Sequence, residues 1–225
     1  MFLGLFTTTR HQQLDKKGQS SLPLLSELMT VAELQAMEKT FGVRLSGEQT
    51  AQIRTYLDLL SLWDRTVNLT RIQSVADQLR FHFFESFWAA DRFLDPNQMI
   101  ADVGSGAGFP GLAMKLFLPS LRLALIEKSA KKIVFLKEAC ATLSLPAAFF
   151  QGRAEDYPGW DTIGLATLRA LTPSAKLVDL LRVHGVKLLW LHGSALGNSM
   201  TGWTLVRQHL VPGSASRFAS LFRCD

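Results

Sequence analysis

The feature that most constrains this chain is a regular alternation of short apolar runs and helical stretches that begins at Met99. Strands are predicted at 99–103, 121–126, 147–150, 163–168 and 186–191. Helices are predicted between them at 110–118, 129–143 and 174–182. Strands joined by helical crossovers pair in parallel, and such a sheet is covered on both faces. The pattern therefore predicts a doubly wound, Rossmann-like α/β fold with a mostly parallel sheet.

The segments on either side of this alternation differ in character. Residues 1–22 show no clear period, so we expect a flexible tail. Region 23–97 is predicted to be an all-helical extension, with helices at 24–39, after a Ser46–Gln49 capping box, and at 74–94. Residues 98–225 then form the α/β core, and the runs at 203–210 and 216–223 are expected to pair as an antiparallel edge of its sheet.

Composition excludes several classes of protein. Of the 225 residues, 48% are hydrophobic and 19% are charged, which is enough apolar material for a core and excludes wholesale disorder. The two cysteines are too few for a disulfide scaffold, and no metal site is predicted. No apolar tract reaches the roughly 18 residues of a membrane span. We expect a cytoplasmic protein without a membrane partner.

The net charge of the chain is +5, which suits a polyanionic partner such as nucleic acid. A basic surface with no specific partner explains this charge equally well.

The strongest local signal is a glycine-rich loop between the first predicted strand and a helix that begins near Pro110. Its glycines are Gly104, Gly106 and Gly108. A dinucleotide-binding fingerprint would need a third glycine at the position of Phe109, so a nicotinamide cofactor is disfavoured. The second strand ends in Glu127, where a carboxylate can accept the ribose hydroxyls of an adenosine. Together these features predict an S-adenosylmethionine site, and we expect Gly106→Val to abolish binding.

Other candidates lie at the same sheet edge. Ala154 and Glu155 follow the third core strand and could hold an adenine edge, although a solvated turn is an equal alternative. Arg169 ends the fourth strand, where it can face a carboxylate or phosphate, and a cleft position predicts that folding does not need it. The lysines after Glu127 are more typical of a solvated helix face. His82, taken alone, is more typical of a structural histidine.

Several ordered segments resemble a known family, the bacterial 16S rRNA guanine-N7 methyltransferases of the GidB type. Trp63–Thr70 is similar to the family's Trp-Asn-x-x-x-Asn-Leu-Thr, and 80–86 is similar to Arg-His-Ile-Leu-Asp-Ser. The loop 102–111, Lys131-Lys132, Arg153-Ala154-Glu155 and Arg169-Ala170 follow in family order. The chain departs from the family at four places: Arg80 stands one residue further from the histidine, Glu85 and Glu127 replace Asp, and His192 replaces Lys.

The resemblance implies roles for particular residues. It places Gly104, Phe109, Ala154, Glu155 and Arg169 where the family binds the cofactor, and the loop pattern adds Gly106, Gly108 and Glu127 to the predicted cofactor site. It places His82, Ser86, Arg153 and Arg217 near the mouth of the site, and with Lys131 and His192 these are the predicted substrate-binding residues. The expected partner is 16S rRNA or the small ribosomal subunit, and a monomer is expected.

The chemistry of guanine N7 explains why no catalytic base is predicted. N7 carries a free lone pair, so no proton has to be removed before the methyl group is transferred. Positive charge moves from the sulfonium to the guanine ring, and positioning should therefore dominate catalysis. Two alternatives remain open: a methyltransferase for a small molecule or protein on the same fold, and an RNA-binding relative that has lost catalysis.

Overall fold

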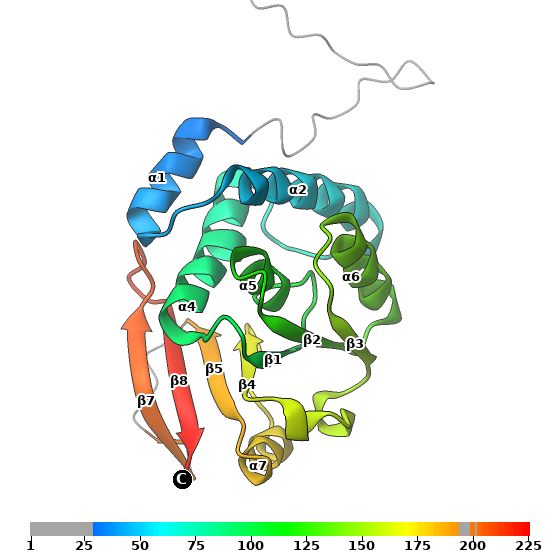
Figure 1. Cartoon of the computed structure of the whole chain (residues 1–225), viewed down its shortest axis with the longest axis vertical. Helices are drawn as coiled ribbons and strands as arrows, with labels where there is room; N and C mark the ends of the chain where they lie inside the picture. The colour runs from blue at the N-terminus through cyan, green and yellow to red at the C-terminus, as the bar shows by residue number, and fades with distance from the viewer. Residues whose placement is uncertain (1–28, 194–198, 201) are drawn as a thin grey trace, which may run out of the picture.

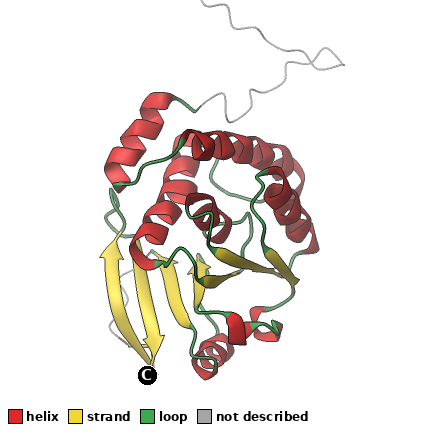
Figure 2. Cartoon of the chain, in the orientation of Figure 1, coloured by secondary structure: helices red, strands yellow, loops and turns green. Residues whose placement is uncertain are grey.

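In the computed structural model, which describes residues 29–193, 199–200 and 202–225, a group of helices precedes an α/β unit (Figures 1 and 2). The helical part comprises α1 (Val31–Phe41), α2 (Gly47–Val67), α3 (Val75–Gln78), the π-helical turn η2 (Leu79–Phe84) and α4 (Glu85–Phe93). The strands are β1 (Met99–Val103), β2 (Arg122–Glu127), β3 (Ala148–Gln151), β4 (Leu165–Arg169), β5 (Lys187–His192), β6 (Ser199–Met200), β7 (Trp203–Leu210) and β8 (Phe218–Cys224). Between them lie α5 (Gly111–Phe117), α6 (Ala130–Thr142), the 3-10 turns η3 (Ala154–Asp156) and η4 (Trp160–Thr162), and α7 (Ala175–Val183).

All the described strands form one sheet in the order β3-β2-β1-β4-β5-β8-β7-β6. Strands β1 to β5 are parallel, and β8 pairs antiparallel with both β5 and β7. The predicted doubly wound sheet with an antiparallel C-terminal edge is therefore confirmed. The two-residue strand β6 was not predicted, and the predicted tail lies outside the described residues.

The two faces of the sheet carry separate hydrophobic clusters, as alternating side chains along each strand require. Leu123 and Leu125 of β2 face the cluster formed with α2, α4, α5 and α6. Ala124 and Ile126 face the other cluster, which includes α7. Figure 1 shows α5 and α6 on one side of the sheet and α7 at the other. The helical region therefore extends the core on one face of the sheet.

The predicted third helix forms, but it is not α-helical throughout. Residues 75–93 are helical, but the stretch 79–84 adopts the wider π-helical turn between α3 and α4. The Glu85 amide donates to the Arg80 carbonyl, five residues back. A π-turn inside a helix is uncommon and frequently marks a functional site. Within the described ranges, no helix has both the length and the hydropathy needed to cross a bilayer.

Candidate functional site

The carboxyl ends of the parallel strands bring the predicted cofactor residues to one edge of the sheet. In the register of β1, Val103 pairs with Ile126 of β2 and with Leu168 of β4. The next residues along these three strands are Gly104, Glu127 and Arg169, so they lie at the same level. β2 also pairs with β3 through Glu127 and Gln151, which places the Gly152–Glu155 segment beside them. This is the edge at which open α/β sheets bind ligands.

The three loop glycines all have positive φ, but their surroundings differ. A Cβ at Gly104 would lie 2.3 Å from the Leu171 side chain, and one at Gly108 would lie 2.2 Å from the Tyr56 hydroxyl. A Cβ at Gly106 would meet only the Gly104 carbonyl, at 3.7 Å. Gly104 and Gly108 therefore allow close packing within the protein, whereas Gly106 faces open space and is the glycine best placed for a ligand.

Glu127 is almost fully buried at the end of β2, and its carboxylate closes onto the loop. Oε2 accepts from the Gly106 amide at 3.0 Å, and Oε1 accepts from the Ser129 amide at 2.8 Å. Each carboxylate oxygen accepts at two lone-pair sites, so one site on each remains for a further donor. Glu127 can therefore fix the loop and still accept hydroxyl groups of a ribose.

Phe109 is the centre of an aromatic stack. Its ring stacks on Tyr56 of α2, with centroids 5.2 Å apart and an interplanar angle of 15°. It also stacks on His82, at 4.5 Å and 11°. The Arg169 guanidinium lies 5.4 Å from the same ring. The residue that replaces the third glycine of a dinucleotide fingerprint thus packs the loop against the helical region.

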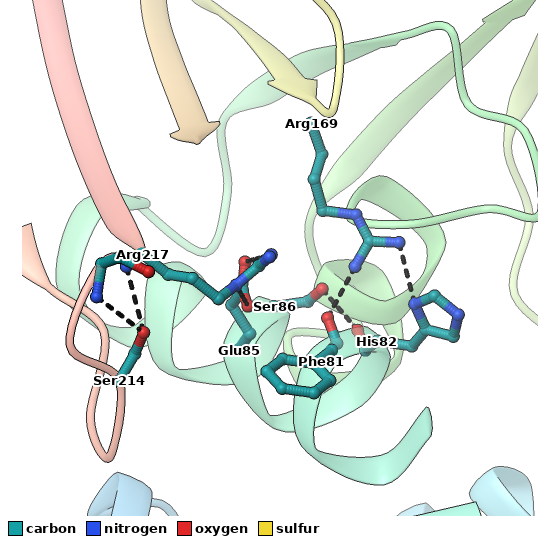
Figure 3. Close-up of polar contacts among 8 residues, drawn as sticks. Phe81, His82, Glu85, Ser86, Arg169, Ser214 and Arg217 are labelled. Atoms are coloured by element: carbon teal, nitrogen blue, oxygen red, sulfur yellow. Dashed lines mark hydrogen bonds and ion pairs between the residues drawn. The ribbon is translucent and has the colours of Figure 1, made fainter. Parts of the chain in front are cut away.

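His82 and Arg169 form a polar contact beside this stack (Figure 3). Arg169 Nη2 lies 2.9 Å from His82 Nδ1, and its Nη1 donates to the Phe81 carbonyl at 2.6 Å. Because an arginine can only donate, Nδ1 must accept and the imidazole proton sits on Nε2. Nε2 then donates to the Thr70 hydroxyl at 2.7 Å. Burial, followed by the charges of Arg169 and Arg217, lowers the pKa of His82 to about 2.

The π-helical turn explains why Phe81 can receive the guanidinium. In an α-helix the amide of Glu85 would bond to the carbonyl of Phe81, four residues back. Here that amide bonds to Arg80 instead, which leaves the Phe81 carbonyl available to Arg169. The irregular turn thus joins the helical region to the end of β4.

Glu85 and Arg217 form a second link at the site. Glu85 is 1% exposed and accepts from Nε and Nη2 of Arg217, both at 2.7 Å (Figure 3). This bidentate pair holds the β7–β8 turn against the helix, and it raises the pKa of Arg217. Arg80 also donates to the Gly213 carbonyl in that turn. Arg217 therefore lies beside the site with two of its nitrogens already engaged.

Ser86 lies in an environment that does not suit the substrate contact expected from the sequence. Its side chain is fully buried, and its hydroxyl donates to the His82 carbonyl at 2.6 Å. In this structure Ser86 therefore supports the helix and is not open to RNA.

The remaining predicted residues follow the ends of β2, β3 and β5. Glu155 follows β3 and accepts from the Ser174 hydroxyl at 2.7 Å, which lowers the pKa of this carboxyl. Ala154 is buried, whereas Arg153 and Lys131 are exposed. His192 ends β5, 8% exposed, with Nε2 2.8 Å from the Ser220 hydroxyl. The buried His192 thus contacts its own sheet through β8.

The sequence did not single out Tyr56, Leu171 or Asp102 as site residues. Asp102 is 1% exposed; its Oδ1 accepts from Thr167, and its Oδ2 has no partner among the described residues. Burial raises its pKa to about 6. One signal could have identified Tyr56, because a hydroxyl on the apolar face of a helix needs a buried acceptor. Across the described ranges, no cluster of side chains is suited to hold a metal ion.

Comparison with known proteins points to one family. Residues 49–196 match the family model GidB, described as rRNA small subunit methyltransferase G. A relative with the name ribosomal RNA small subunit methyltransferase G, from Moorella thermoacetica, is 41% identical over 127 residues, which is 55% of this chain and 52% of the relative. The same-named protein of Dichelobacter nodosus is 33% identical over 169 residues, 73% of this chain and 72% of the relative. The matched segment thus spans between about half and three quarters of these two relatives.

Solved structures support the same fold. A SAM-dependent methyltransferase from Aquifex aeolicus superposes with a TM-score of 0.54 over 66% of this chain and 93% of that chain, at 14% identity. The glycine loop, Glu127, Arg169 and the π-helical turn all lie inside the segment matched by the family model. The chain belongs to the GidB family of rRNA small subunit methyltransferase G proteins.

Proposed function

We propose that this protein transfers a methyl group from S-adenosylmethionine to N7 of a guanine in 16S rRNA, acting as a cytoplasmic monomer on the RNA or the small ribosomal subunit. The observation that carries the proposal is the meeting of Gly106, Glu127 and Arg169 at one sheet edge, inside the segment that matches the family model.

The residues present fit the adenosyl ligand. Gly106 faces open space, and Glu127 is held at the strand end with lone pairs to spare. Neither feature requires a phosphate. When bound, S-adenosylmethionine supplies an electrophilic methyl group on its sulfonium. We assign the ribose to Glu127, the adenine edge to Ala154 and Glu155, and the carboxylate end to Arg169. Gly104, Gly108 and Phe109 hold the loop in shape.

The chain's own residues then act by positioning. His82 cannot serve as a general base, because its Nδ1 already accepts from Arg169 and its pKa lies near 2. That state suits guanine N7, which has no proton to lose. Arg80, Arg169 and Arg217 all contact Phe81, and only Arg217 among them makes an ion pair within the described residues, with Glu85, so we expect this end of the site to be positively charged. Such a charge favours approach of an RNA backbone. Exposed Arg153 and Lys131 extend it along the rim.

The test is methylation of unmodified ribosomal substrates. Purified protein is incubated with labelled S-adenosylmethionine and with 16S rRNA, small subunits or total protein from cells that lack it. Modified positions are then mapped by strand cleavage at N7-methylguanosine. The proposal expects label at one guanine of 16S rRNA and none with Gly106→Val. Label on protein, or on small molecules alone, would assign the fold to another methyl acceptor. Cofactor binding without transfer to any substrate would indicate a relative that has lost catalysis.

A further inference from the structure

The hydroxyl of Tyr56 reaches from the helical region to the backbone of the glycine loop. Tyr56 lies on α2 and is fully buried. Its hydroxyl donates to the Ala107 carbonyl at 2.7 Å. Ala107 stands between Gly106 and Gly108, whose φ values are 57° and 84°. The bond therefore fixes the Ala107–Gly108 peptide unit, one of the two that join these left-handed glycines.

Gly108 is shaped to this hydroxyl. A Cβ at Gly108 would lie 2.2 Å from the Tyr56 oxygen, so any side chain there would exclude the tyrosine hydroxyl. Gly108 thus leaves room for the Tyr56 hydroxyl, whereas Gly106 faces open space. Tyr56 and Gly108 form a matched pair within the loop.

The tyrosine also belongs to the stack that leads to the polar site. Its ring stacks on Phe109, which in turn stacks on His82, the partner of Arg169. Burial raises the pKa of Tyr56 well above its usual value, so the hydroxyl remains a donor at every working pH.

We infer that Tyr56 is a positioning residue through which the N-terminal helical region holds the glycine loop in its cofactor-binding shape. This inference rests on the proposed function. It assigns a role in cofactor binding to a residue outside the cofactor-binding core, on a helix that the strand–helix alternation does not include.

The test removes only the hydroxyl, with Tyr56→Phe, and measures binding of S-adenosylmethionine by calorimetry. One net hydrogen bond predicts a dissociation constant raised roughly two- to tenfold. The second readout is hydrogen exchange of the amides of Ala107, Gly108 and Phe109 in cofactor-free protein. We expect them to exchange faster by a similar factor, while amides of β2 and β4 keep their protection.

Two controls separate positioning from plain destabilisation. Tyr157→Phe removes the other tyrosine hydroxyl of the chain, which makes no hydrogen bond to a described residue. Ile53→Val trims a fully buried side chain on the same helix and should lower the melting temperature by about 2–4 °C. Neither should change the dissociation constant or the loop exchange.

The outcomes are distinct. If Tyr56→Phe binds the cofactor like wild type and its loop amides keep their protection, the inference is overturned. If Ile53→Val weakens binding equally, Tyr56 acts only through stability, which also overturns it. If wild type binds no S-adenosylmethionine, the proposed function fails, and the exchange measurement still decides whether Tyr56 orders the loop.

Discussion

Arg169 donates to Nδ1 of His82 across 2.9 Å, and this contact fixes the imidazole as a neutral ring with its proton on Nε2. A cationic imidazole would set two positive groups against each other. The end of β4 and the π-helical turn are therefore joined by an interaction that requires an uncharged histidine.

The first prediction concerns Arg169. Its position in a cleft suggested that folding would not need it, but its guanidinium bridges Phe81 and His82. Each lost charged hydrogen bond costs about 1.5–3 kcal/mol. Arg169→Ala should therefore lower the melting temperature as well as methylation, and Lys should be intermediate because an ammonium lacks the planar fork. Thermal melts and methylation rates check this. An Ala variant that melts like wild type would show that the bridge contributes nothing to folding.

The second prediction is a pH dependence from His82. Its folded pKa of about 2 lies below the usual 6.5, so the unfolded chain binds more protons between these values. This contribution to stability is complete above pH 6.5 and is lost as the pH falls, at about 1.4 kcal/mol per pH unit. His82→Asn should remove that loss, because its amide oxygen can still accept from Arg169. Urea titrations from pH 7.5 to 4.5 measure the slope. Equal slopes in both proteins would contradict a buried neutral histidine.

The third prediction is that Asp102 makes folding stability depend on pH with the opposite sign. Its folded pKa of about 6 lies above the usual 3.8, so the folded protein binds more protons between these values. The contribution is complete below about pH 3.8 and is lost as the pH rises through 6, to a total near 3 kcal/mol. Asp102→Asn should therefore be more stable than wild type at pH 7.5, and the advantage should vanish near pH 4. Urea titrations at the two pH values check this. His82→Asn is the comparison, because its stability relative to wild type should instead increase as the pH falls.

The parallel strands of the sheet could be predicted because each is marked by a short apolar run in the local sequence. Each apolar run between helical stretches identifies a buried strand. The parallel register, with β1 between β2 and β4, then brings Gly104, Glu127 and Arg169 together. The helical region was predicted less well. A single π-helical turn shifts the apolar pattern of a helix by only one residue, which is within the tolerance of a pattern search. It is held here by contacts with Arg169 and Arg217, which lie far away in sequence.

Residue roles within the site were harder to predict for the same reason. A glycine with positive φ looks alike in sequence whether a ligand, a leucine or a tyrosine fills the space beside it. Ser86 was expected at the mouth of the site because segment 80–86 resembles a family motif. In the structure its hydroxyl instead donates to the His82 carbonyl of the same helix. Such distinctions depend on which tertiary neighbour occupies the space.

The glycines provide the fourth prediction. Gly106→Ala has room and should cost only the left-handed strain of about 1–2 kcal/mol, yet its methyl group projects toward the ligand side. Gly108→Ala adds a clash with Tyr56, worth about a further 1–3 kcal/mol. Thermal melts and calorimetry should show Gly106→Ala folded with impaired cofactor binding, and Gly108→Ala markedly less stable. The reverse order of stabilities would contradict the assignment of Gly106 to the ligand.

The last prediction concerns the salt dependence of RNA binding. Lys131 and Arg153 are exposed beside the carboxyl edge of the sheet, where an RNA backbone would pass. A phosphate contact releases counterions, so the logarithm of affinity falls with the logarithm of salt by about 0.7 for each contact to a single strand. Replacing both residues with alanine should weaken binding and flatten this slope by about twice that amount. Lys187 is also exposed but begins β5, at the opposite end of the sheet, so Lys187→Ala should leave the slope unchanged. Binding titrations at several salt concentrations measure all three proteins. If Lys187→Ala flattens the slope as much as the double variant does, RNA binding depends on the net charge of the protein and not on the position of Lys131 and Arg153.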